Sequence, residues 1–401
     1  MNAVEIWLFN NNNKLKKIIE ELTPAIDPSE ITDFEAVREL VRQNLHETVF
    51  SIGDQFLIDY TNEGGTTYSV PWDVVSFEKV NGRPALWLES HYAFEEIQFD
   101  QNEGFYVVPA GGCPAGTYQF TTGTSWGSIV SGKTYVFTTT EDYAEGDIWQ
   151  IGTSSSEIGG YDPSTWKIRT YKASGGVSAN LVASPTETLS IAEGTGDTDL
   201  GTISSSTKYG TSGLNNLQRA CYGYNRWSQS AFRQWLNSDA AVGEWWTPQN
   251  PYDRRPSQLA TRRGFMAGLD PDFVSVVQPI DVVTALNTVS DSDIGTKETT
   301  VDKFFLAGLE QEYVSPQLAG EGNYWPYWKQ RIGTDNPTAT GTTQAERIRY
   351  RYDATTTAVY CRLRSALRYV AYSAWYVNSS GYVSHTNSTS SYRGCPACVI
   401  F

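Results

Sequence analysis

Apolar residues in the first 45 positions recur with helical spacing. Leu15, Ile18, Ile19 and Leu22 follow the i, i+3, i+4, i+7 pattern, and Pro24 ends the run. The stretch "TDFE" (residues 32–35) has the spacing of a capping box, and it opens a second stripe of Phe34, Val37, Leu40 and Val41. We therefore predict an N-terminal arm of two short helices, residues 1–47.

The apolar period changes to two after Phe50, which is typical of strands with one buried face. Phe56, Ile58 and Tyr60 alternate with polar neighbours, and "NEGG" follows as a turn signal. The same strand-like pattern of apolar and polar residues continues in "PALWLESHYAF", "GTYQFTT", "KTYVFTTT" and "DIWQIG". These segments predict a β-domain at residues 48–152, followed by a Gly/Ser/Thr-rich connecting region at residues 153–202.

A mixed pattern follows in residues 203–401. Trp227, Ala231, Trp235 and Leu236 fall on one helical face, while Asp270 and Pro271 have the identities of an N-cap and a first helical residue. Short strand candidates separated by long loops follow. The whole chain therefore predicts an α+β fold with short N-terminal helices, a β-rich middle domain and a separate C-terminal domain.

The last forty residues predict a hairpin rich in tyrosine. In "AWYVNSSGYVS", a turn at Ser379–Gly381 would pair Val377 with Val383 and Tyr376 with Ser384. Trp375 would then face the core and Tyr376 the solvent. Tyr beside small polar residues is also the composition of antibody paratopes, where Tyr supplies contact area at low entropic cost. The alternative to a binding surface is an ordinary β-sheet with Tyr on its solvent-exposed face.

Charge and length exclude several classes of protein. The net charge is −15, and residues 1–200 hold 29 acidic and 11 basic residues. Nucleic acid is therefore not expected as a partner, because binding to its phosphates needs a basic surface. No stretch of 18 apolar residues and no signal peptide is found, so we expect no membrane insertion and synthesis in a cytoplasm.

Catalytic and metal-binding motifs are mostly missing from the sequence. "CPAC" (residues 395–398) lacks the second ligand pair of a zinc site, and the three histidines are far apart. We interpret these cysteines as buried structural thiols and predict no cofactor, no metal and no enzymatic activity. Glycan hydrolysis by paired carboxylates stays open, because that geometry is not visible in sequence.

The codons offer one further pattern. Changing only the adenines of an AAC asparagine codon reaches Tyr, Ser, His, Thr, Val, Leu, Ala and Arg, but not Lys, Glu, Gln or Met. None of those last four residues occurs between Leu367 and Tyr392. Trp is also unreachable, and the segment contains one, Trp375, at a position predicted to lie in the core. This is the residue usage that adenine-directed diversification would leave.

These features resemble the variable proteins of phage diversity-generating retroelements, the tropism-determinant family. The resemblance is carried by "WSQSAFRQWLNS", "GFMAGLDPDF", "DKFFLAGLEQEY", "AWYVNSSGYVS", the frame Leu363-Arg364-Ser365 and the close "GCPACVIF". It covers roughly residues 203–401. The chain departs from the family at Arg362, where an aromatic residue commonly precedes the frame.

The resemblance implies a C-type-lectin-like domain at residues 203–401, related to formylglycine-generating enzymes, with the C-terminal strands in its middle. It implies a phage receptor-binding protein in the virion, on a tail fibre or head surface, with host-cell-surface protein or glycan and other virion proteins as partners. A homotrimer built through the N-terminal half is expected. The variable ligand-binding positions would be Leu367, Tyr369, Val370, Tyr372, Ser373, Tyr376, Tyr382, Ser384, His385, Thr386, Asn387, Thr389, Ser390 and Tyr392.

Two other functions remain open at this stage. One is an architectural virion protein without a receptor role. The other is an oxidase of the formylglycine-generating type, which would use a copper-binding pair of cysteines, either Cys395 with Cys398 or Cys221 with Cys361.

Overall fold

The computed structural model describes residues 27–125, 130–153, 165–172, 184–208 and 213–401. It contains 16% helix and 35% strand, which confirms a β-rich α+β fold. The helices are short, and none of those described is long and apolar enough to span a membrane. The α-helices are α2 (Phe34–Arg42), α3 (His46–Val49), α4 (Leu217–Tyr222), α5 (Ala231–Leu236), α6 (Pro271–Val276) and α7 (Pro326–Ile332).

A five-stranded antiparallel sheet forms the centre of the main body and joins both ends of the described chain. Its order is β1-β2-β3-β22-β15, with bounds β1 Gln55–Thr61, β2 Thr67–Ser76, β3 Leu86–Ser90, β22 Pro396–Ile400 and β15 Phe305–Leu306. The apolar close of the chain is thus strand β22, which is buried between β3 and β15, with Cys398 paired to Leu88.

The predicted patterns at the start of this sheet are confirmed. Phe56, Ile58 and Tyr60 are the buried residues of β1, and "NEGG" turns the chain into β2. The second predicted helix exists as α2, but its N-cap is Asp33 rather than Thr32, since the Asp33 carboxylate accepts from the Ala36 amide. The first predicted helix, at Leu15–Leu22, lies outside the described residues.

The apolar stripe of helix α2 is buried against other residues of the same chain. Phe34, Val37 and Val41 are buried, and the Phe34 ring meets Phe273 of α6 edge-on at 5.2 Å between ring centroids. The Asp270–Pro271 start predicted for α6 is confirmed, because the Asp270 side chain accepts from the Asp272 amide.

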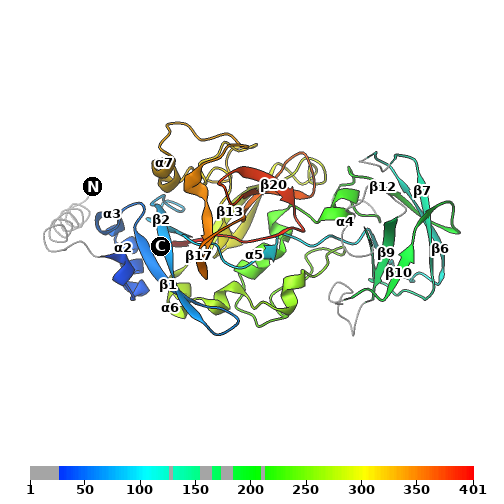
Figure 1. Ribbon diagram of the computed structural model, residues 1–401, viewed down its shortest axis with the longest axis horizontal. Coiled ribbons are helices and arrows are strands. Elements are labelled where there is room, and N and C mark those ends of the chain that lie inside the picture. The colour runs from blue at the N-terminus through cyan, green and yellow to red at the C-terminus, as the bar shows by residue number, and fades with distance from the viewer. Residues whose placement is uncertain (1–26, 126–129, 154–164, 173–183, 209–212) are drawn as a thin grey trace, which may run out of the picture.

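A β-sandwich of two four-stranded sheets projects from one end of the body (Figure 1). One sheet is β10-β9-β8-β5, with bounds β10 Glu187–Ser190, β9 Trp166–Tyr171, β8 Ile148–Thr153 and β5 Tyr106–Val107. The other is β11-β7-β6-β12, with bounds β11 Ala192–Glu193, β7 Thr134–Thr139, β6 Gly116–Thr122 and β12 Thr198–Ile203. Aromatic residues, among them Phe120, Phe137, Trp149 and Trp166, fill the core between the sheets.

The predicted domain boundaries therefore differ from the observed ones. Strands β1 to β3 belong to the core of the body, together with residues of the C-terminal half, whereas β5 to β12 share a separate core. The range 48–152 thus contains parts of two units, and the range 153–202 contributes sandwich strands instead of only connecting them. Strand patterns show which residues are buried but not which strand each one pairs with, so the insertion was not visible.

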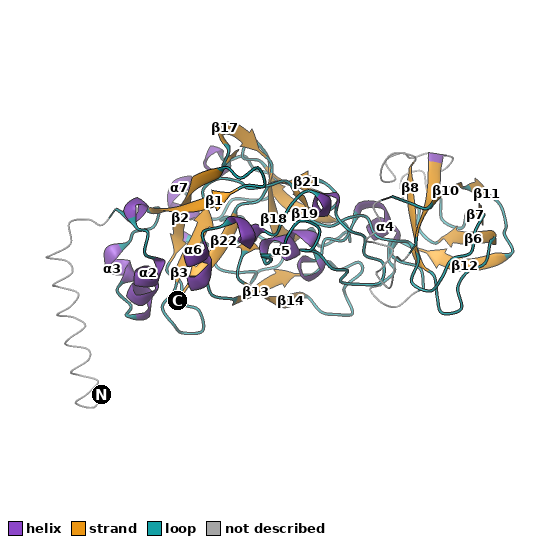
Figure 2. Cartoon of the chain, turned by 90° about the horizontal axis from the view of Figure 1, so that it is seen from below, coloured by secondary structure: helices purple, strands orange, loops and turns teal. Residues whose placement is uncertain are grey.

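The rest of the body consists of small sheets and helices on the central sheet. The strands are β13 (Ile280–Ala285) paired with β14 (Lys297–Asp302), β16 (Arg349–Arg351) with β17 (Ala354–Val359), β21 (Ser391–Tyr392) with β4 (Ile97–Gln98), and the sheet β18 (Cys361–Ala366), β19 (Ser373–Val377), β20 (Val383–Asn387). Trp227, Ala231, Trp235 and Leu236 are fully buried, but they do not share one helix as predicted, because Trp227 lies in a separate 3-10 helix (Trp227–Gln229) and α5 begins at Ala231. In Figure 2, α4 lies between this body and the sandwich.

Candidate functional site

The predicted hairpin is present and carries most of the candidate residues. Strands β19 and β20 pair Val377 with Val383 and Tyr376 with Ser384, and Gly381 adopts a left-handed φ of 81° in the turn. Trp375, Val377 and Val383 are buried, whereas Tyr376 is half-buried. The predicted register and the predicted division between buried and exposed faces are both confirmed.

Three tyrosines form an aromatic cluster on the outer face of this sheet. The Tyr376 ring stacks on Tyr360 at 5.6 Å and meets Tyr392 edge-on at 4.9 Å, and Tyr360 meets Tyr392 at 5.2 Å. Tyr360 is 41% exposed. It was not predicted, because it precedes the Tyr/Ser-rich segment and only the fold of β18 brings it beside Tyr376.

The other predicted tyrosines lie apart from this cluster. Tyr369 is 60% exposed and approaches His385, which in turn packs on Trp375. Tyr372 packs on Tyr222 of α4 at 5.1 Å. Tyr382 is 37% exposed and lies in the turn region of the hairpin, beside Gly341. The tyrosines therefore form several neighbouring contacts instead of one continuous patch.

Three of the predicted variable positions are buried. Leu367, Ser373 and Thr389 are 1%, 3% and 5% exposed, and Leu367 belongs to the core of the body. Composition alone could not separate these residues from their exposed neighbours. The eleven remaining positions are exposed or half-buried: Tyr369, Val370, Tyr372, Tyr376, Tyr382, Ser384, His385, Thr386, Asn387, Ser390 and Tyr392.

The main chain of the loop before β19 is held by one side chain from outside the segment. The side-chain Nδ2 group of Asn225 donates to the carbonyls of Leu367, Val370 and Ser373 at 3.2, 2.9 and 2.8 Å. The backbone amide of Asn225 donates to the carbonyl of Ala371. The Oδ1 atom of Asn225 accepts from Asn287, which fixes the orientation of the amide group. These bonds reach only backbone atoms of the loop, so they do not depend on its side chains.

Arg362 holds the main chain of the hairpin in the same way. Its guanidinium donates to the carbonyls of Ala374, Asn387 and Ser390 at 3.0 Å each, and it lies 4.8 Å from the Tyr392 ring centroid. Arg362 is 1% exposed, and its burial lowers the pKa to about 10, so it remains charged at neutral pH. Arg362 therefore places a cation under the outer face of the sheet.

The turn of the hairpin depends on Gly381. A Cβ atom there would lie 2.0 Å from the Gln344 carbonyl oxygen, and the positive φ disfavours any other residue. We expect Gly381→Ala to cost about 3 kcal/mol or more of unfolding free energy. Gly333→Ala is the matched control, because its φ is also positive (69°) but nothing lies within 4 Å. Chemical denaturation of both variants measures the difference, and equal losses would contradict the close approach to Gln344.

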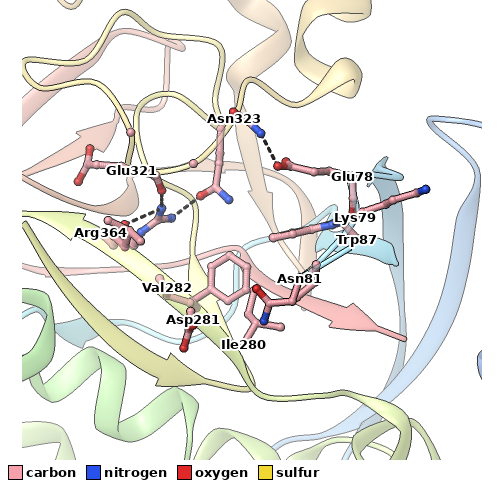
Figure 3. Close-up of a pocket in the computed structure, with 16 residues that line it drawn as sticks. Glu78, Lys79, Asn81, Trp87, Ile280, Asp281, Val282, Glu321, Asn323 and Arg364 are labelled. Carbon is pink, nitrogen blue, oxygen red and sulfur yellow. Dashed lines mark hydrogen bonds between the residues drawn. The ribbon is translucent and has the colours of Figure 1, made fainter. Parts of the chain in front are cut away.

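A cavity of about 320 Å³ opens elsewhere on the body, between Trp87 and Arg364 (Figure 3). No residue of 367–392 lines it. The Arg364 guanidinium donates to Leu306 and Gln311 and to the Glu321 carbonyl, while the Glu321 carboxylate accepts from Ser365. The polar groups of this cavity thus bond to one another, and the Leu-Arg-Ser frame has a structural role here.

The cysteines do not form either of the pairs considered for copper. Cys398 lies in the core of the body, Cys221 in the sandwich core, and Cys361 and Cys395 in a third apolar cluster. The Sγ atoms of Cys361 and Cys395 are 3.4 Å apart, which sequence spacing did not suggest. Burial raises the pKa of the Cys395 and Cys398 thiols well above the usual range, so neither is a nucleophile near pH 7.

Comparison with known proteins gives one match. Residues 203–400, just under half of the chain, match the model of a family described as a domain of unknown function, DUF6273. No curated protein and no solved structure matches the chain. The matched range begins at the last residue of sandwich strand β12 and does not include β1 to β3, although these strands share the central sheet with β22.

Proposed function

We propose that this chain is a phage receptor-binding protein that presents residues 369–392, together with Tyr360, to a host-surface ligand. One observation carries the proposal. Asn225 and Arg362 fix the main chain of residues 367–390 through carbonyl oxygens, while the side chains of the eleven accessible candidate positions in residues 369–392 reach solvent. Such an arrangement permits many side-chain combinations on one backbone.

The order of the central sheet supports a C-type-lectin-like fold for the body. The last strand, β22, lies inside the sheet between β3 and β15, as the resemblance to the variable proteins implies. The body would then consist of residues 27–104 and 215–401, with the sandwich as an insertion. Residues 203–401 alone would lack four of its strands, β1 to β4.

The chemistry of the face favours a neutral ligand, either a protein surface or an exposed glycan. None of the eleven accessible positions is occupied by Asp, Glu, Lys or Arg, and burial lowers the pKa of His385, so that it is neutral at pH 7. Tyrosine rings bind apolar surface and sugar faces, while Ser, Thr and Asn add adaptable hydrogen bonds. Phosphate-rich ligands such as nucleic acid would find no cation among these positions.

Trimeric assembly in a virion belongs to the same proposal. A small face binds weakly, and linking several copies raises avidity by about 10²–10⁴ without new contacts. Helix α2 does not supply the interface through its buried stripe, because α6 covers that stripe. Light scattering on the full chain measures the number of copies.

A library randomised at the eleven accessible positions tests the proposal. We expect most members to fold, as judged by protease resistance, and selection against lysozyme as a probe to enrich binders over many rounds. The control library varies three exposed threonines of β17, Thr355, Thr356 and Thr357, on the same body. If the face library yields no more binders than the control library, an architectural virion role without a receptor function is favoured.

A further inference from the structure

Three carboxylates meet at the base of the sandwich. Asp100 and Glu103 lie in the segment that leads from β4 into the sandwich, and Asp253 lies in a loop of the body. One oxygen of each carboxylate lies within 4.8 Å of the others. The three residues are 1%, 0% and 0% exposed.

One guanidinium faces these three carboxylates. Arg219 of α4 donates to both oxygens of Glu103 at 2.8 Å, and Asn250 donates to Glu103 at 3.0 Å and to Asp253 at 3.2 Å. If all three carboxylates are ionised, the cluster carries two unbalanced negative charges away from water. Such a charge excess is strongly unfavourable unless protons or a cation neutralise it.

Asp100 supplies a second, independent observation. Its Oδ2 atom accepts from the Tyr224 amide at 2.9 Å, whereas its Oδ1 atom is shielded from solvent and has no hydrogen-bond partner within the described residues. A buried carboxylate oxygen without a donor needs either a proton or a bound cation, because its desolvation is otherwise uncompensated. Asp100 thus combines an unpartnered oxygen with a place in the carboxylate group that it forms with Glu103 and Asp253.

We propose that Asp100, Glu103 and Asp253 bind a hard divalent cation, Ca²⁺, which fixes the sandwich to the body. A charge of +2 balances the two excess negative charges. All three candidate ligands are oxygens, which excludes the soft metals that prefer sulfur. Ca²⁺ fits a buried site of protein oxygens better than Mg²⁺, which usually keeps several of its waters.

The position of the site gives the cation a structural role. The chain enters the sandwich at residues 100–104 and leaves it at residues 215–225. These two crossings are hydrogen-bonded to each other, because the Asn215 side chain donates to the Gly104 carbonyl and the Glu103 backbone amide donates to the Arg219 carbonyl. Asp253 belongs to neither crossing. A cation bound by all three carboxylates would therefore connect the base of the sandwich to the body.

The site is also hydrogen-bonded to the buried main chain of the candidate binding segment. The Asp100 amide donates to the carbonyl of Ser388, directly after β20, at 3.1 Å. The inference itself does not depend on the proposed function, since it rests on the carboxylates and on Asp100 Oδ1.

Thermal unfolding of the full chain in EDTA and in CaCl₂ tests the site. We expect Ca²⁺ at a hundredfold above its Kd to raise the Tm by about 5–10 °C. Tb³⁺, a probe for Ca²⁺ sites, should emit when the protein's tyrosines are excited, and Ca²⁺ should quench that emission. The Tm rise should shrink at lower pH, because carboxylate ligands must be deprotonated to bind the cation and protons then compete with it.

The Asp253→Asn variant separates a bound cation from a general effect of salt. It should lose the Ca²⁺ response and, in EDTA, be at least as stable as the parent protein, because it removes one uncompensated charge. Asp335→Asn, at an exposed position, is the control and should keep the full response. Asp100→Asn replaces Asp253→Asn if the latter does not fold. The proposal is overturned if CaCl₂ leaves the Tm of the parent protein unchanged and Tb³⁺ does not emit.

Discussion

Replacing Arg362 by Met should lower the unfolding free energy of the body by about 3–5 kcal/mol. It should also abolish ligand binding, because the hairpin that carries the binding residues is no longer held in place. Met has a similar length but donates no hydrogen bond, so the carbonyls of Ala374, Asn387 and Ser390 lose a shared donor. Each buried carbonyl left without a donor costs about 1–3 kcal/mol. Because the hydrogen bonds of Arg362 reach only backbone atoms of the hairpin, the loss should be the same whatever residues occupy positions 376 and 384, provided that Tyr392, whose ring faces the guanidinium, is kept.

Urea denaturation of the full chain measures this effect, and Arg331→Met serves as the control at an exposed position of α7. The comparison should be repeated in a second background that carries different residues at Tyr376 and Ser384. A loss below about 1 kcal/mol, typical of surface substitutions, would show that Arg362 does not hold the hairpin.

Replacing Tyr369, Tyr376 and Tyr382 together by Ala should reduce ligand affinity by about 10²–10⁴, because exposed tyrosines of binding faces commonly contribute more than 1 kcal/mol each. The Tm should fall by only a few degrees, since none of the three side chains is buried. Adsorption of the labelled protein to cells that the parent protein binds gives the affinity, and calorimetry gives the Tm.

Tyr324→Ala is the matched control for this triple variant. Tyr324 is 38% exposed, close to the 37% of Tyr382, but it lies beside α7 and away from the hairpin. Its replacement should leave adsorption unchanged. If the triple variant binds like the parent protein, the ligand uses another surface. If it unfolds, the tyrosines act as core residues instead.

The features that could be predicted from sequence are local ones. The turn at Gly381, the register of the hairpin and the Asp270–Pro271 helix start all follow from neighbouring residues, and all are confirmed. The alternation of Phe56, Ile58 and Tyr60 likewise gave the buried face of β1.

The features that could not be predicted depend on contacts between distant residues. Asn225 lies about 140 positions before the carbonyls that it holds, and its sequence neighbourhood gives no sign of this role. Strand β3 pairs with β22 across about 300 positions, so the inserted sandwich was taken as part of one β-domain. Leu367, Ser373 and Thr389 shared the composition of the segment, and only the packing of the loop shows that they are buried.

Sequencing the coding region of this chain from many closely related genomes tests the central claim most directly. We predict that amino-acid differences concentrate at the eleven accessible positions of 369–392, that they are those reachable by changing adenines of asparagine codons, and that Asn225, Arg362 and Gly381 stay constant. Differences spread evenly over residues 203–401, or a segment 369–392 that does not vary, would contradict a diversified binding face on a fixed main chain.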